Sequence, residues 1–150
     1  MSKPKAQQRP GRMLGVTLEP TPQDSVRVGS LLCDREDNVA FVVDEAYLEM
    51  GPSRPVLSSA WRSPGDEART IARLTMIEDK RARHGALPPW FANLLPEGAL
   101  REMVEREMGA GPHSDFDMLA RLGGDLPGAV VVRDEREARV GQMPIRAADQ

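Results

Sequence analysis

The chain has one cysteine, no long hydrophobic run and no strong excess of one charge. Cys33 is the single cysteine among 150 residues, so no disulfide can form within the chain. The longest apolar runs, such as 129–132, span a few residues, whereas a transmembrane helix needs roughly 20. The basic N-terminus is followed by no apolar segment of the kind that a signal peptide carries. Together these absences predict a cytoplasmic protein that does not enter a membrane.

The charge balance argues against a surface that binds nucleic acid over the whole chain. There are 20 basic and 23 acidic residues, for a net charge of -3. Residues 1–12 differ, because they carry four positive charges and no acidic residue. We interpret this segment as a disordered basic tail. A basic arm that contacts phosphates is the alternative, although the segment has no aromatic side chain to stack on a base.

What the chain does contain fits one folded domain of ordinary size. Hydrophobic residues make up 40% of the sequence and charged residues 29%, which is typical of a soluble core. We expect the domain to occupy residues 13–133. After Arg133 the chain is charged and has no periodicity, so residues 134–150 are predicted to be a second disordered tail.

Alternating apolar residues predict several strands. Residues 13–18 are predicted as a first strand, and the segments 26–32 and 39–43 alternate and are joined by a short polar loop that indicates a β-hairpin. We expect a further strand in 55–60. The apolar run at 129–132 favours a buried strand near the end of the domain.

Helix signals fall between these strands. The pattern Ser63-Pro64-Gly65-Asp66 predicts a helix that begins with Ser63 as its cap and continues to about Arg81, although β-branched residues leave a strand possible. One helical turn is expected in 44–50, a short buried helix in 90–95, and longer helices in 97–108 and from Ser114 to Gly123. The apolar faces expected for these helices are Ala68, Ile71, Ala72 and Met76, with Leu74 and Ile77 alongside; Trp90, Phe91, Leu94 and Leu95; Leu100, Met103, Val104 and Met108; and Phe116, Leu119 and Ala120. The predicted fold class is α+β, with a small antiparallel β-sheet or partly closed barrel packed with three to four helices.

The sequence indicates no catalytic, cofactor-binding or metal-binding residues. His84 and His113 lie in polar loops and do not combine with Cys33 into a spacing typical of metal ligands. The glycines at 123 and 124 precede a strand, whereas a phosphate-binding loop precedes a helix. A helix cap that leads into a sharp turn explains them better.

Trp61 and Arg62 are the candidate partner-binding residues. They stand in a polar stretch flanked by glycine and proline, and both residue types are enriched at binding hot spots. The alternative is that Trp61 folds onto the sheet as part of the core, because tryptophan is buried on average.

Two motifs resemble the N-terminal subdomain of HipA-family proteins. Residues 90–102, WFANLLPEGALRE, are similar to the family signature FFxNLLPEG. Residues 116–132, FDMLARLGGDLPGAVVV, are similar to a second family segment, and upstream pieces follow in the family's order. The resemblance covers about residues 13–133, and the stretch 62–86 is longer than the matching loop of that family.

The resemblance implies a part in a toxin–antitoxin system. HipA proteins are serine/threonine kinases that are held by a helix-turn-helix antitoxin, HipB, and their kinase core follows this subdomain. The chain lacks the catalytic-loop and metal-binding motifs of a kinase core, so we expect no enzyme activity. It resembles HipS, a separate subdomain that restrains a shortened kinase, HipT. The expected partner is a HipA- or HipT-like kinase, with a HipB-like protein as a further partner and no direct nucleic acid. The alternative is the N-terminal segment of a HipA kinase whose core is absent here.

Overall fold

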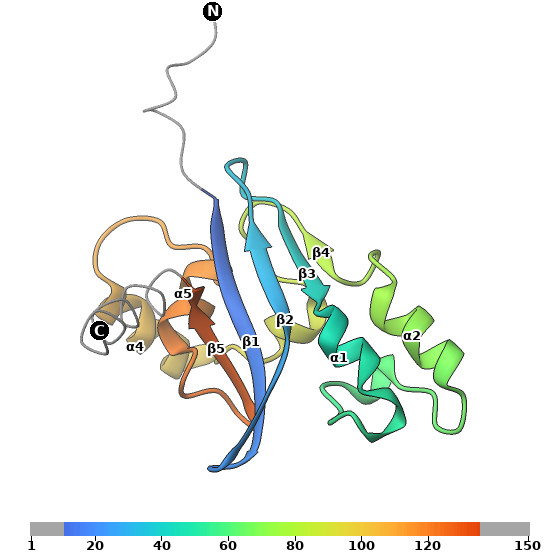
Figure 1. Cartoon of the computed structure of the whole chain (residues 1–150). Coiled ribbons are helices and arrows are strands. Elements are labelled where there is room, and N and C mark those ends of the chain that lie inside the picture. The colour runs from blue at the N-terminus through green and yellow to red at the C-terminus, as the bar shows by residue number, and fades with distance from the viewer. Residues whose placement is uncertain (1–10, 136–150) are drawn as a thin grey trace, which may run out of the picture.

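The computed structural model describes residues 11–135, which form a sheet with the strand order β4-β3-β2-β1-β5 (Figure 1). All neighbouring strands pair antiparallel. The strands are β1 (Arg12–Thr21), β2 (Asp24–Cys33), β3 (Val39–Val43), β4 (Arg81–Ala82) and β5 (Val130–Asp134). The helices are α1 (Glu45–Glu49), α2 (Glu67–Thr75), α3 (Pro89–Ala92), α4 (Gly98–Met108) and α5 (Asp115–Leu122), with short 3-10 helices η2 (Gly51–Ser53) and η3 (Ser59–Trp61). The predicted α+β class is confirmed, and the sheet is open, not closed into a barrel.

The predicted tails lie almost wholly outside the described residues. At their inner ends, two residues assigned to the tails belong to the sheet: Arg12 begins β1 and Asp134 ends β5. No helix within residues 11–135 combines the length and the apolar character that crossing a bilayer requires.

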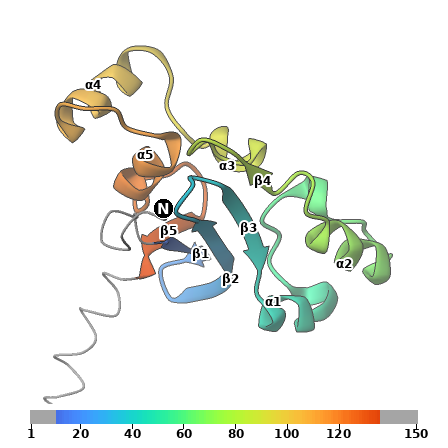
Figure 2. The same ribbon diagram turned by 90° about the horizontal axis from the view of Figure 1, so that it is seen from above.

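The helices lie on one face of the sheet and at its β3 end (Figures 1 and 2). Seen from above, α3 and α5 lie behind the strands, α4 projects beyond α5, and α1 and α2 lie beyond β3 (Figure 2). The core between the sheet and the helices contains Leu14 and Val16 from β1 and Phe91 and Phe116 from the helices. Val42, on the opposite face of β3, is exposed.

The alternation of β1, β2 and β3 sets which face is buried. Leu14 pairs with Leu31, and Leu31 pairs with Phe41, so one row of apolar side chains crosses all three strands. The predicted hairpin between 26–32 and 39–43 is confirmed. Its loop is closed by the Asp34 carboxylate, which accepts hydrogen bonds from the backbone N–H groups of Glu36 and Asn38 at 2.8 and 2.9 Å.

The strand predicted in 55–60 is wrong. Pro55 has no backbone N–H to donate to a ladder. Three residues later the Ser58 hydroxyl accepts a hydrogen bond from the N–H of Ala60 at 3.2 Å, and the chain turns into η3. The segment therefore leaves the sheet and places Trp61 beneath α2.

The helix predicted from Ser63 is present, but its cap, end and buried face differ. Asp66 is the cap residue, and its side chain accepts from the N–H of Arg69. The helix ends at Thr75, and the segment after it forms a loop and then β4, so the prediction of a helix to Arg81 is wrong. The buried residues are Thr70 and Leu74, and of the predicted apolar residues only Leu74, expected alongside the face, is buried. Thr70 tolerates burial because its hydroxyl donates to backbone carbonyls of Ser63 and Asp66.

Helices α4 and α5 begin and end close to the predicted residues, whereas α3 begins as predicted but ends at Ala92, before the predicted end at Leu95. The Ser114 hydroxyl accepts from the N–H of Asp117, whose carboxylate accepts from the N–H of Ser114, so α5 starts with a complete capping box. The predicted face of α4 is wrong in part. Val104 is buried and Met108 half-buried, but Leu100 and Met103 are 54% and 46% exposed.

Gly123 is the C-cap residue of α5, as predicted, but the reason for a glycine there is not its backbone conformation. Its φ of -48° is open to any residue, so a glycine is not required by backbone conformation. A Cβ placed on it would lie 1.7 Å from the carbonyl oxygen of Val132. The N–H of Val132 also donates to the carbonyl of Gly123 at 2.9 Å. Glycine is needed because α5 and β5 touch backbone to backbone at this point.

Candidate functional site

The predicted site residue Trp61 lies beneath α2 and against the sheet. Its side chain is only 4% exposed. The indole stacks on Phe41 of β3, with ring centroids 5.9 Å apart and planes 18° apart, and Trp90 contacts it at 5.9 Å. The indole of Trp61 therefore packs on the sheet, as the alternative interpretation of this residue expected. The partner-binding role of Trp61 and Arg62 stays a prediction.

A buried lysine completes the surroundings of Trp61. The Lys80 ammonium lies 4.5 Å from the indole centroid, a cation–π distance. It donates to the carbonyls of Arg73 and Met76 at 2.6 and 2.8 Å, at the C-terminal end of α2. Because these carbonyls have no partner within the helix, Lys80 supplies the hydrogen bonds and the positive charge that a helix C-terminus favours.

Asp79 joins the lysine to the tryptophan. Its carboxylate accepts from the indole N–H of Trp61 at 2.8 Å and from the Lys80 ammonium at 3.0 Å. Burial opposes ionisation of this carboxyl, but the two hydrogen bonds and the positive charge of Lys80 outweigh it, and the pKa of Asp79 is lowered. The group therefore stays ionised at neutral pH and holds the loop after α2 against the core.

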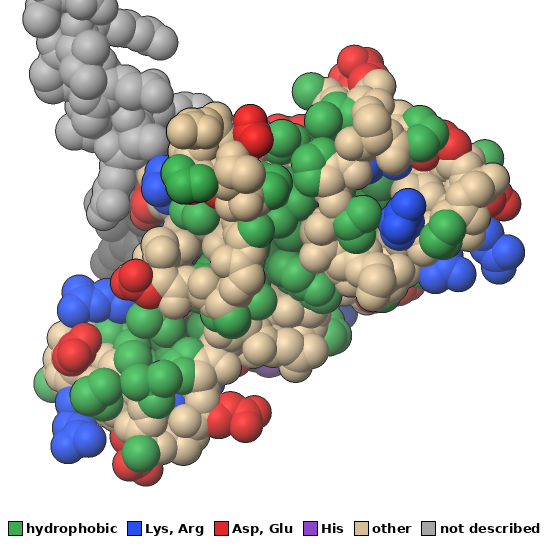
Figure 3. All heavy atoms as spheres, turned by 90° about the horizontal axis from the view of Figure 1, so that it is seen from below, with side chains coloured by type: hydrophobic (Ala, Val, Ile, Leu, Met, Phe, Trp, Pro, Cys, Tyr) green, Lys and Arg blue, Asp and Glu red, His purple; other side chains and the backbone are tan. Residues whose placement is uncertain are grey.

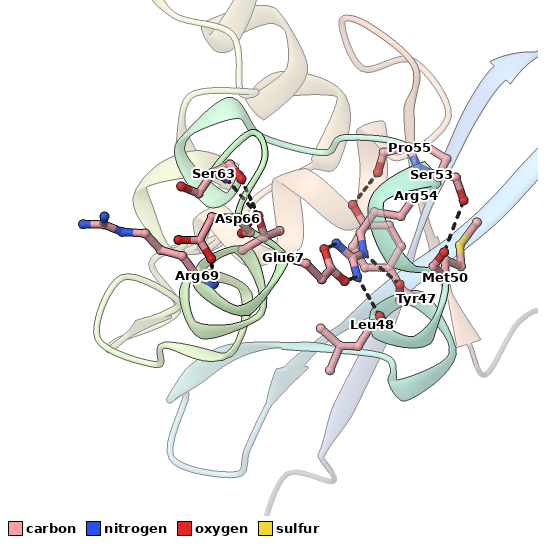
Figure 4. A network of polar contacts seen from close by, with 11 residues as sticks. Tyr47, Leu48, Met50, Ser53, Arg54, Pro55, Ser63, Asp66, Glu67 and Arg69 are labelled. Carbon is pink, nitrogen blue, oxygen red and sulfur yellow. Dashed lines mark hydrogen bonds and ion pairs between the residues drawn. The ribbon is translucent and has the colours of Figure 1, made fainter.

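A second buried cation, Arg54, fastens α1 to α2 (Figure 4). Its guanidinium donates to the carbonyls of Tyr47 and Leu48 at 3.1 and 2.6 Å, and it pairs with both carboxylate oxygens of Glu67 at 3.0 and 2.5 Å. The hydrogen bond from Arg54 lowers the pKa of Glu67. The Tyr47 hydroxyl donates to the carbonyl of Pro55. Burial raises the pKa of Tyr47, so the phenol stays neutral.

A cavity of about 190 Å³ opens between these two anchors. Trp61 and Arg62 both line it, so the structure brings the two predicted site residues to one pocket. The rest of the lining is mixed, with apolar residues such as Val56, Leu57 and Leu74 beside polar ones that include Ser58, Asp66 and Glu67. Arg54, Thr70 and the other buried polar side chains of the described chain already have hydrogen-bond partners. The pocket therefore suits an apolar side chain better than a charged ligand.

Neither histidine nor the cysteine forms part of a metal site in residues 11–135, where no three metal-ligating side chains gather. His113 contacts the carbonyl of Gly109 across a loop, and Cys33 is buried at the end of β2. His84 adopts a φ of 60° in the turn after β4.

The other notable surface is an exposed apolar face on α4. Leu100 and Met103 are separated by three positions and lie on one side of the helix. Figure 3 shows hydrophobic side chains gathered on the projecting lobe that contains α4, at the lower left, with charged side chains around them. No apolar element of the described chain covers this face.

The fold and these surfaces define a small α+β domain that offers a pocket and an apolar helix face. The chain belongs to the HipA N-terminal domain family, whose model matches residues 23–133. It is 36% identical over 105 residues to "Putative kinase Y4dM" of Sinorhizobium fredii (strain NBRC 101917 / NGR234), covering 70% of this chain and 24% of the relative. It is 29% identical over 119 residues to "Putative kinase Y4mE" of the same organism, covering 78% of this chain and 25% of the relative. The chain thus spans about a quarter of the length of these curated relatives.

Sequence reasoning missed the two buried cations and their partners. Nothing in the local sequence distinguishes Lys80 from the many exposed basic residues, because its role depends on the end of α2 and on Trp61. Arg54 had a weak signal, since it opens a segment that follows the order of HipA-family sequences. The sequence showed the apolar stripe of α4, but it did not show that half of this stripe is exposed.

Proposed function

We propose that this chain is a non-catalytic module of a HipA- or HipBST-like type II toxin–antitoxin system. It binds and restrains a HipA- or HipT-like serine/threonine kinase in the cytoplasm, and a HipB-like helix-turn-helix protein is a further partner. The observation that carries this proposal is the match of residues 23–133 to the HipA N-terminal domain. The names of the two relatives add support, because both are described as kinases.

A second candidate is the N-terminal segment of a HipA kinase. It is favoured by the share of the relatives that the chain spans, 24% and 25%. The domain would then contact the kinase within one polypeptide and not as a separate subunit. In both cases the domain packs on a kinase, and the two candidates differ only in the covalent connection.

Co-expression tests the proposal. A HipA- or HipT-like kinase encoded beside this gene is expressed with and without the chain. We expect the chain to relieve the growth arrest caused by the kinase and to elute with it in gel filtration. If the kinase is equally toxic with the chain present and the two proteins elute separately, the proposal is wrong. A native polypeptide about four times as long as the matched segment would favour the second candidate.

Arg62 lines the pocket and is exposed, so it is the part of the predicted site that a partner can reach directly. Arg62→Glu is expected to weaken the kinase complex without changing the midpoint of thermal unfolding. Arg83→Glu is the matched control, because Arg83 is also exposed and lies after β4. Equal binding by both variants would remove Arg62 from the interface.

A further inference from the structure

Helix α4 is amphipathic, but only half of its apolar stripe is used within the described chain. The stripe contains Leu100, Met103, Val104 and Met108. Val104 and part of Met108 face the rest of the domain, whereas Leu100 and Met103 face outward. An exposed apolar stripe on a projecting helix costs solvation free energy and is a common mark of an interaction surface.

Polar contacts fix the direction in which this face points. Arg101 of α4 donates to the carboxylate of Asp115 at the start of α5 at 2.6 Å. Glu107 lies 3.7 Å from Arg121 near the end of α5. These two pairs, together with the buried Val104, join α4 to α5, which lie next to each other in Figure 2, while Leu100 and Met103 stay exposed.

The end of the matched segment lies on the same side of the molecule as α4. The family match ends at Arg133 in β5, and the next residue, Asp134, pairs with Leu14 of β1. Two residues before Leu14, Arg12 forms an ion pair with Asp117 of α5. The first turn of α5 in turn carries Asp115, the partner of Arg101. Any polypeptide that follows this domain therefore starts beside α5, the helix on which α4 packs.

In the relatives a large polypeptide does accompany this domain. The matched part is 24% and 25% of their chains, so about three quarters lies outside it. Because the matching family is described as the N-terminal domain of HipA, that remainder follows the match. It therefore continues from the end of β5, which lies near α5, the helix on which α4 packs.

We propose that Leu100 and Met103 form the surface that docks on the kinase portion of this family. The occupant is an apolar patch of the kinase, supplied by a separate subunit or by the continuing chain. This inference rests on the function proposed above and specifies which surface carries it. The pocket at Trp61 and Arg62 lies at the other end of the sheet, so the two surfaces can be tested separately.

The test compares two double variants whose substituted side chains are exposed to a similar degree. Leu100→Glu with Met103→Glu alters the α4 face, where the side chains are 54% and 46% exposed. Met76→Glu with Ile77→Glu is the control after α2, where they are 48% and 57% exposed. Each double variant adds two negative charges and leaves the buried core unchanged. Thermal unfolding of each variant is measured first, and both midpoints are expected to stay near that of the wild type.

The affinity of each form for the co-expressed kinase is then measured with purified proteins. We expect the α4 variant to raise the Kd at least tenfold and the control to change it less than threefold. Equal Kd values for wild type and the α4 variant would overturn the inference while leaving the proposed function in place. A larger effect of the control would place the interface near α2 and overturn it as well. No complex with the wild type would instead reject the proposed function.

Sedimentation of the wild type alone distinguishes a second copy of the chain as the occupant. We expect a monomer at micromolar concentration, with or without the α4 substitutions. A dimer that dissociates only in the α4 variant would show that the face binds another copy and would overturn the assignment to a kinase.

Discussion

Residues 44–80 and residues 98–122 flank the sheet in Figure 1, and they are held to it in opposite ways. The first segment buries two cations, Arg54 and Lys80, and supplies partners for both. The second attaches α4 through Val104 and surface ion pairs, and it leaves apolar side chains in solvent. Burying a charge is costly unless it is paired, so the first segment is tied to a single arrangement. The second keeps hydrophobic surface available for a contact outside the domain.

The largest expected loss of stability comes from removing the indole of Trp61, in the segment 44–80. Trp61→Ala leaves a void between Phe41, Trp90 and Lys80, and we expect a loss of about 4 kcal/mol in the free energy of unfolding. Trp61→Phe, which retains a ring but loses the N–H that donates to the Asp79 carboxylate, is the control and should cost about 2 kcal/mol. Urea denaturation measures both. An alanine variant as stable as the wild type would mean that the indole is not core.

Next in size is a substitution that separates α5 from β5. Gly123→Ala places a methyl group against the Val132 carbonyl and should destabilise the fold by about 3 kcal/mol, because neither backbone segment can move freely. The neighbouring Gly124→Ala is the control, since a Cβ there meets no atom within 4 Å. The midpoint of thermal unfolding compares the two variants. Similar midpoints would show that α5 can shift relative to the sheet at little cost.

Loss of the buried lysine should have an intermediate effect. Lys80→Met keeps the volume of the side chain but leaves the carbonyls of Arg73 and Met76 without their donor, at a cost of about 2 kcal/mol. Hydrogen exchange is expected to speed up in α2 and to stay unchanged in α4. The exposed Arg62→Met serves as control. If exchange rises equally in both helices, the two segments unfold together and the comparison between them fails.

The smallest expected change in stability comes from lowering the pH, which should act on both segments. Asp79 in the first segment and Asp117 in the second have a pKa below the ordinary value for aspartate. Because their folded pKa lies below the unfolded one, stability is fully present above about pH 4 and falls as pH drops through the folded pKa. Asp117→Asn should flatten this slope in pH-dependent urea titrations, and the exposed Asp125→Asn should not. An unchanged slope in Asp117→Asn would contradict the assignment.

Much of the fold follows from local patterns in the sequence. The apolar segment 13–18 placed β1, alternation placed β2 and β3, and Ser114 as a cap residue gave the start of α5. These features succeed because they depend on neighbouring residues alone. Segment 55–60 misled the prediction, because its apolar residues face a pocket and α2 and not a neighbouring strand.

The site was less predictable because it is made by long-range contacts. Trp61 was identified as notable, yet its burial depends on Phe41, Trp90 and Lys80, which come from distant parts of the chain. The stripe on α4 shows the opposite problem. Periodicity correctly found the apolar residues, but it gives no information on whether the surface that covers them lies within the same domain.

The contact between Gly123 and Val132 also bears on aggregation. A strand at the edge of a sheet with free backbone groups can pair with the edge of another molecule. The N–H of Val132 on the edge strand β5 is occupied by the carbonyl of Gly123. At the opposite edge β4 is only two residues long, and the N–H of Phe41 on β3 is occupied by the carbonyl of Lys80. Both ends of the sheet are therefore poor templates for strand addition, which protects a domain with an apolar helix face from polymerising through its backbone.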